Sequence, residues 1–179
     1  IANLGYAGVN FCRPVYVGDT IKASSKIIGL KENSNEKTGT VYVESLGKNQ
    51  KNEVVLKYYR WLMMRKKKNG MIEGFNNVLP ELPEKVETKD FEIPLKINYE
   101  NWDNEITGSN FFYDDYLVDE KIDHLDGQTI EEAEHQLATR LYQNNARVHF
   151  NHHIEKDGRF GKRIIYGGYI ISLARAISC

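Results

Sequence analysis

The residues whose types and spacing suit chemistry gather in one stretch, residues 139–176. Asn144 offers a hydrogen-bonding amide, Arg147 a permanent cation, and His149 an imidazole that can exchange a proton near neutral pH. A histidine of this kind can serve as a general base, and an arginine can hold a carboxylate through two parallel hydrogen bonds. The stretch therefore predicts a site that moves a proton beside an anionic ligand.

Gly167 and Gly168 form the second feature of this stretch. The apolar residues after them recur at helical spacing: Ile170, Ile171, Leu173, Ala174 and Ile177. The first amides of a helix have no partner within it and carry the positive end of its dipole. Glycine there lets a ligand come close to the backbone. The pair thus predicts a helix start that binds an anion, or a carbonyl oxygen that gains negative charge.

These residues also have structural interpretations, which the sequence leaves open. A lone histidine is often structural, asparagine is common in turns, and Arg147 can form a surface salt bridge. Metal binding is an alternative for the set His149, His152, His153, Asp123 and His124. No cysteine pair and no HExxH spacing accompanies that set. No Gly-x-Ser-x-Gly motif is present, so nucleophilic hydrolysis has little support.

The elements that must position these residues are predicted to be strands first and helices later. Residues 3–65 are typical of β structure, and three hairpin-linked antiparallel strands form a meander. The predicted strands are Leu4–Phe11, Ile21–Ile27, Val41–Val43 and Glu53–Met64. The basic run Arg65–Lys68 follows, either as a phosphate-binding patch or as the solvated end of a strand.

Residues 70–110 contain three prolines and little periodicity, which predicts a linker that packs in part on its neighbours. Beyond it, Lys121–His124 is a predicted strand. Thr129–Glu132 has the capping-box pattern of a helix start. The predicted apolar face of that helix consists of Ile130, Ala133, Leu137 and Leu141.

Composition excludes several classes of protein. The chain has 179 residues, 41% of them hydrophobic, and a formal net charge of −1, so nothing indicates binding to nucleic acid or to an anionic membrane. No apolar run could span a bilayer, and two cysteines suit a reducing, cytoplasmic compartment. The chain begins at Ile1 and stops within an apolar helical pattern, so we expect it to be an internal piece of a longer protein.

Several segments together carry a family resemblance: Pro14–Thr20, Ile28–Asn35, Arg60–Lys66, Ala138–Asn144, Ala146–Asn151, Gly158–Gly161 and Ile165–Gly168. They resemble the MaoC-like hot-dog dehydratases, nearest the mesaconyl-CoA hydratase group. The resemblance covers nearly the whole chain apart from the linker. It implies an α+β double hot-dog fold, in which each half is an antiparallel sheet wrapped around one long helix. Residues 1–69 are then the later strands of the first half, 70–110 the linker, and 111–179 the opening of the second half, up to its central helix.

The resemblance also implies roles for single residues. The broader hydratase motif is similar to Asp-x-Asn-Pro-x-His, and its catalytic Asp and His positions are Asn144 and His149 here. Asn144 cannot accept a proton as a carboxylate would, so His149 is expected to transfer the proton while Asn144 orients water. The expected substrate-binding residues are Arg147, Tyr166, Gly167 and Gly168.

The implied reaction is the reversible hydration of an α,β-unsaturated acyl-CoA thioester, with mesaconyl-CoA as the expected substrate. The resemblance implies no cofactor, because coenzyme A arrives as part of the substrate, and we expect the full-length protein to form a homo-oligomer. Two alternatives stay open. One is a hot-dog acyl-CoA thioesterase, and the other is a hot-dog module that binds acyl-CoA without turnover.

Overall fold

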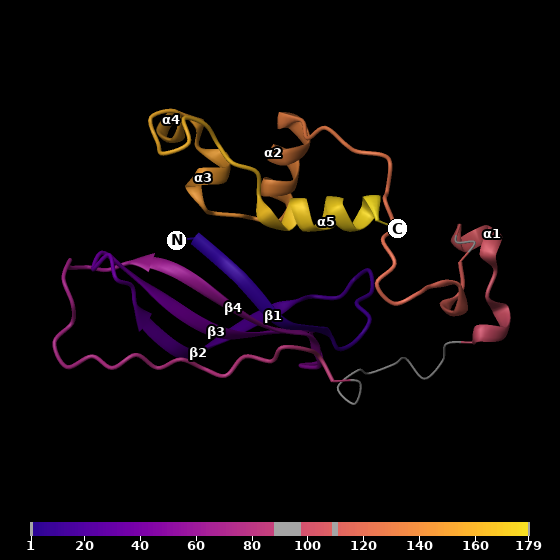
Figure 1. The fold of residues 1–179 in the computed structure, drawn as a ribbon, viewed down its shortest axis with the longest axis horizontal. Coiled ribbons are helices and arrows are strands. Elements are labelled where there is room, and N and C mark those ends of the chain that lie inside the picture. The colour runs from indigo at the N-terminus through magenta and orange to yellow at the C-terminus, as the bar shows by residue number, and fades with distance from the viewer. Residues whose placement is uncertain (1, 88–97, 109–110, 179) are drawn as a thin grey trace. The chain divides into compact units, whose positions relative to one another are not determined.

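The computed structural model describes residues 2–87, 98–108 and 111–178. These residues belong to two compact units, Ile1–Trp102 and Asp103–Cys179, and each unit is described by itself (Figure 1). Among the described residues, no helix has both the length and the apolar character needed to cross a membrane.

The first unit is built on one four-stranded antiparallel sheet, in the order β1-β4-β3-β2 (Figure 1). Its strands are β1 (Ala2–Phe11), β2 (Lys22–Glu32), β3 (Thr38–Lys48) and β4 (Val54–Arg65). The predicted meander is therefore confirmed for β2, β3 and β4, and β1 pairs with β4 on the far side. The strands are longer than predicted at several ends, because ladder pairing continues through polar residues that carry no hydrophobic signal.

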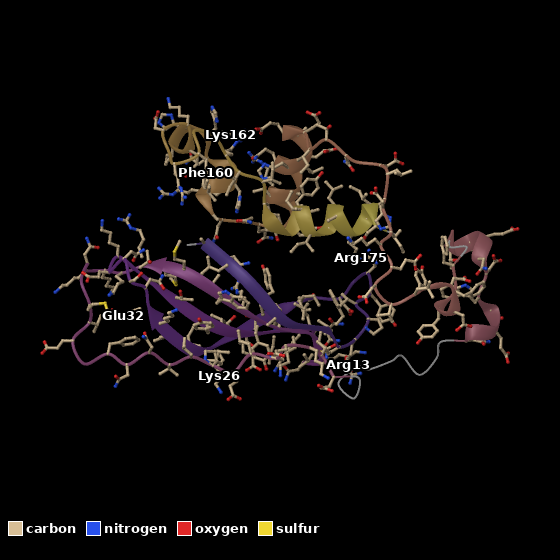
Figure 2. All side chains as sticks on the ribbon, in the orientation of Figure 1. Arg13, Lys26, Glu32, Phe160, Lys162 and Arg175 are labelled. Carbon is tan, nitrogen blue, oxygen red and sulfur yellow. The ribbon has the colours of Figure 1, made fainter. Side chains whose placement is uncertain are left out.

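A buried carboxylate fastens the segment after β4 to the sheet. Glu32, labelled in Figure 2, lies at the end of β2. It is 8% exposed and accepts a hydrogen bond from the Lys66 ammonium. It also accepts one from the Ile72 amide at 3.1 Å. Farther along, Leu30 and Val78 exchange two backbone hydrogen bonds, of 2.9 and 2.8 Å. Part of the predicted linker thus packs on the sheet, and Lys66 of the basic run neutralises Glu32 instead of facing solvent.

Few apolar side chains are enclosed in either unit. Among the described residues only Val43 and Val55 are buried hydrophobic side chains, each 3% exposed. Many large apolar side chains are exposed, including Tyr6, Val9, Phe11, Ile21, Ile27, Leu137, Leu141, Ile170 and Ile171. Surfaces of this kind normally lie against another part of a protein.

Short helices make up the second unit, and one 3-10 helix, Tyr99–Asn101, precedes it. The elements of the unit are α1 (Asn104–Thr107), the 3-10 turn Tyr113–Asp115, α2 (Glu132–Leu141), α3 (Arg147–Phe150), α4 (His152–Glu155) and α5 (Gly167–Ile177). The predicted helix after the glycine pair is confirmed as α5. The predicted strand Lys121–His124 is wrong, because those residues are irregular and the described part of this unit contains no strand for them to pair with.

Helix α2 also differs from its prediction. It begins two residues later than the capping-box pattern indicated, with Glu131 as its cap and a 3.4 Å hydrogen bond from the Glu131 amide to the Glu134 carboxylate. Its buried residues are His135 and Thr139, whereas Leu137 and Leu141 are 69% and 68% exposed. The predicted apolar face therefore points away from the other described residues of the unit, because polar side chains hold the inner face.

Candidate active site

His149 lies on α3, and its ring is fixed by the backbone of a later segment. Its Nδ1 is 2.9 Å from the carbonyl oxygen of Ile164. A carbonyl can only accept, so Nδ1 carries the proton and, in the neutral ring, Nε2 keeps a free lone pair. The Ile164 amide in turn donates to the Val148 carbonyl at 3.1 Å. This pairing of the two segments gives the imidazole the tautomer that a general base needs at Nε2.

Asn144 shapes the turn that leads into α3. Its Oδ1 accepts the Ala146 amide at 3.0 Å, and its own amide donates to the Thr139 carbonyl at 2.9 Å. Gln143, just before it, has a positive φ of 51°, which completes the sharp change of direction after α2. Because the side-chain oxygen is used in the turn, the group that Asn144 has left to offer a ligand is its NH2, a donor.

Arg147 begins α3 with its side chain exposed. None of the ion pairs formed among the described residues includes its guanidinium. The structure thus leaves Arg147 accessible to an anionic ligand, two residues from His149 on the same turn of helix.

The start of α5 has the open amides that the glycine pair predicts. The amides of Tyr169 and Ile170 both donate to the Tyr166 carbonyl, at 3.0 and 3.3 Å. Within the described part of the chain, no hydrogen bond uses the amide of Gly167 or Gly168. These two N–H groups therefore remain free to donate to a ligand at the positive end of an eleven-residue helix.

The two glycines differ in their surroundings. A Cβ built on Gly168 would lie 2.4 Å from the hydroxyl oxygen of Tyr166, so the tyrosine ring folds over a position where only hydrogen fits. A Cβ on Gly167 would meet no atom within 4 Å. Gly168 is thus needed for packing of the ring, whereas the open space at Gly167 allows a ligand to approach.

Aromatic contacts bring the imidazole and the helix start together. The rings of His149 and Tyr166 meet edge to face with centroids 6.0 Å apart, and the Tyr142 and Tyr166 ring centroids are 6.3 Å apart. Of the six predicted site residues, His149, Tyr166 and the adjoining glycines are thereby gathered in one place. Asn144 and Arg147 flank it through the turn and helix that carry His149.

His135 is a site residue that the sequence analysis missed. It is 1% exposed, and its Nε2 accepts the Tyr166 amide at 3.1 Å. Burial, followed by the nearby His149 charge, lowers the pKa of His135. The next residue, Gln136, donates from Nε2 to the His149 carbonyl at 2.9 Å. The one sequence feature that indicates its burial is the four-residue spacing of His135 and Thr139, which places both on one face of the helix. The leucines at 137 and 141 predicted instead that another face would be buried.

Chemically, the arrangement combines a lone pair on an imidazole with two amide donors that have no acceptor among the residues the structure describes. Such a pair can move a proton at one atom of a ligand while stabilising negative charge at another. Among the described residues no three His, Cys, Asp or Glu side chains are grouped as metal ligands, so the five-residue metal set is not brought together.

No family model matches the chain. Among curated proteins, it is 56% identical over 178 residues to the β-methylmalyl-CoA dehydratase of Chloroflexus aurantiacus, and 48% identical over 178 residues to the mesaconyl-CoA hydratase of Cereibacter sphaeroides. Each alignment covers 99% of this chain, but only 50% and 51% of the relatives. The chain thus spans about half the length of the curated relatives it matches.

Two solved structures are also similar to the chain. A MaoC domain protein dehydratase from Chloroflexus aurantiacus, described as putative, superposes with a TM-score of 0.93 at 56% identity, over 99% of this chain and 50% of that one. A conserved hypothetical protein from Mycobacterium tuberculosis, described as having a double hotdog fold, superposes with a TM-score of 0.59 at 20% identity. The latter identity supports the fold alone.

Proposed function

We propose, from the premise that this chain is homologous to the MaoC-like hot-dog dehydratases, that the protein containing it reversibly hydrates an α,β-unsaturated acyl-CoA. The observation that carries the proposal is identity of 56% and 48%, across 99% of the chain, to a β-methylmalyl-CoA dehydratase and a mesaconyl-CoA hydratase. The proposed substrate is accordingly mesaconyl-CoA, and the product β-methylmalyl-CoA.

In the proposed reaction, His149 Nε2 removes a proton from water as the water oxygen bonds to the β-carbon. The electron pair of the double bond moves toward the thioester carbonyl and forms an enolate. The His149 imidazolium then gives that proton to the α-carbon, which restores the neutral ring and the thioester carbonyl, and dehydration is the reverse sequence. The tautomer fixed by the Ile164 carbonyl supports this role, because it leaves the lone pair at Nε2.

The free amides of Gly167 and Gly168 would stabilise the enolate oxygen. They carry the partial positive charge of a helix start and have no acceptor among the described residues. Donors aimed at the developing charge typically lower the barrier by about 3–4 kcal/mol each. Tyr166, packed against His149 and above Gly168, would form one wall of the substrate site.

Asn144 and Arg147 have supporting roles in the proposal. Since Asn144 Oδ1 is held by the Ala146 amide, its NH2 would donate to the attacking water and orient it, without taking a proton. Arg147 would hold the free carboxylate of the dicarboxylic acyl group, which distinguishes mesaconyl-CoA from a plain enoyl chain. No resident cofactor enters these steps, and coenzyme A belongs to the substrate. A homo-oligomer in the cytoplasm stays the expected setting.

The test is an assay of the full-length protein with mesaconyl-CoA and two readouts, loss of the enoyl absorbance and release of free CoA. Hydration predicts a loss of absorbance without thiol release. Release of CoA would instead identify a thioesterase. Tight binding with neither signal would identify a non-catalytic acyl-CoA-binding module, and either result would overturn the proposal.

A further inference from the structure

We propose that His135 is a positioning residue, whose neutral ring holds the Tyr166 peptide so that the free amides of α5 point at the substrate oxygen. The proposal rests on the hydratase function above, and one of its readouts does not depend on activity. It begins from the burial of His135, which is 1% exposed, while its side chain reaches across from α2 to the start of α5.

The contact requires one protonation state. Nε2 of His135 accepts the Tyr166 amide at 3.1 Å, so the proton of the neutral ring lies on Nδ1. An imidazolium has a proton on both nitrogens and could not accept this bond. The 3.4 Å approach of Gln136 Nε2 to Nδ1 is then a contact between two donors, and the Gln136 amide is satisfied by the His149 carbonyl at 2.9 Å.

Holding Tyr166 determines where the free amides point. The Gly167 N–H belongs to the peptide that follows Tyr166, so its direction is set by the ψ of Tyr166, which is 123°. The Tyr166 carbonyl is already fixed by the amides of Tyr169 and Ile170. His135 fixes the other end of the same residue. Two glycines follow, and they would otherwise allow the helix start to vary.

The same turn of α2 also positions the proposed base. Gln136 donates to the His149 carbonyl, and the rings of His135 and His149 lie edge to face with centroids 6.4 Å apart. Residues 135 and 136 therefore hold the donors and the base in one fixed relation. A displacement of about 1 Å between such groups can reduce the rate about a hundredfold.

The charges around His135 keep its ring neutral. The His149 and Arg163 charges lower its pKa further beyond the effect of burial, and Glu132 on its own helix opposes them. Tyr166, the residue that caps α5, presents its peptide N–H to the His135 ring. Acid that protonates His135 would break the bond to Tyr166 and misplace the amides, so this protonation should abolish hydration.

The experiment compares full-length wild type with His135→Gln, His135→Leu and the control His153→Gln, which alters an exposed histidine on α4. Glutamine can accept the Tyr166 amide but does not titrate, whereas leucine cannot accept. We expect leucine to lower kcat about a hundredfold with KM little changed, glutamine to restore kcat to within about tenfold of wild type, and the control to match wild type.

Two readouts separate positioning from mere packing. On the acid side, log(kcat/KM) should fall more steeply with decreasing pH in wild type and the control than in His135→Gln, which lacks the titrating ring. Hydrogen exchange at the Tyr166 amide should be slow in wild type and His135→Gln and fast in His135→Leu, whether or not the protein hydrates mesaconyl-CoA.

Equal exchange in all variants would overturn the proposal, as would equal acid slopes in wild type and His135→Gln. If His135→Leu does not fold, the comparison of acid slopes between wild type and His135→Gln still tests the proposal. If wild type shows no hydration while the exchange pattern holds, the proposed function fails and the anchoring of Tyr166 stands.

Discussion

At the scale of single residues, the site depends on which atom of each side chain is already in use. His149 uses Nδ1 on the Ile164 carbonyl and Asn144 uses Oδ1 on a turn amide, so each presents one defined group. The sequence identified both residues, because their spacing matched a known motif. It could not identify His135, since a lone histidine carries no sign of which amide it will meet after folding.

Replacing His149 with alanine tests the proposed base. We expect kcat for mesaconyl-CoA hydration to fall about a hundredfold or more, because general base catalysis contributes on that order. Circular dichroism and thermal unfolding of the full-length variant would check that its fold is kept. His153→Ala on exposed α4 is the matched control, and hydration by His149→Ala at the wild-type rate would exclude the role.

Arg147→Lys tests the proposed carboxylate contact. Lysine keeps the charge but not the planar pair of donors, so the preference for mesaconyl-CoA over a neutral enoyl-CoA should fall about tenfold. The measurement is the ratio of kcat/KM for the two substrates. An unchanged ratio would show that Arg147 does not select the substrate.

The adjoining glycines should respond differently to alanine. Gly167→Ala fits without a clash, so it should leave stability unchanged or raise it by up to about 1 kcal/mol, because alanine favours helices. Its methyl group would still obstruct a ligand, and kcat/KM should fall about tenfold or more.

Gly168→Ala should instead displace the Tyr166 ring, whose hydroxyl oxygen lies 2.4 Å from the new carbon, and lower activity without that gain in stability. Thermal unfolding and steady-state kinetics together distinguish the two, and full activity in Gly167→Ala would contradict the proposed ligand approach.

At the scale of elements, the strands and α5 were predictable and the inner face of α2 was not. The strand predicted at Ile21–Ile27 and the helix predicted after the glycine pair both form, as β2 and α5, and each was predicted from a local sequence pattern. Which face of α2 is buried depends on the residues that pack against the helix, and the sequence of the helix alone does not indicate them. In this unit His135 accepts a hydrogen bond from the Tyr166 amide and Gln136 donates one to the His149 carbonyl, so these polar residues face inward and the leucines are exposed.

The Glu32 anchor makes a prediction about acid stability. The Lys66 ammonium, with the Ile72 amide, lowers the pKa of Glu32 below its ordinary value of 4.5, although burial opposes this. A carboxyl with a lowered folded pKa stabilises the folded state above its unfolded pKa, and this contribution is lost as the pH falls through the folded pKa. Glu32→Gln should therefore weaken attachment of residues 70–78 at neutral pH and remove part of the acid dependence below about 4.5.

That prediction can be measured by limited proteolysis and by urea unfolding of the full-length protein as a function of pH. The exposed pair Lys85 and Glu87 provides the control, because breaking it with Glu87→Gln should change little. Identical cleavage of residues 70–78 in wild type and Glu32→Gln would contradict the anchor.

At the scale of the whole molecule, the resemblance to the MaoC-like dehydratases and the hot-dog class of the fold are confirmed by the relatives and solved structures. The division into residues 1–69, 70–110 and 111–179 stays a prediction, and the linker includes residues outside the described ranges. The sequence could not predict which apolar side chains become buried. Among the described residues, only Val43 and Val55 are buried apolar side chains.

The 179-residue chain expressed by itself should therefore be inactive and should self-associate. Its exposed apolar side chains include Phe11, at 78%, and Leu137, at 69%, and such surfaces drive association. Light scattering after size exclusion and binding of a hydrophobic dye would test this, with the full-length protein as control. A monomer of these residues that hydrates mesaconyl-CoA would contradict the prediction.

The position of β2 at one margin of the sheet has a consequence for the newly made chain. A sheet margin with unpaired backbone groups can template fibrils. Here Val78 occupies one site on that margin, opposite Leu30, while Lys22, Lys26 (Figure 2) and Lys31 place exposed charges along it. In a ribosome-bound chain that has made only this sheet, the lysines already oppose amyloid growth, and Val78 adds its pairing once residues up to 78 have been synthesised.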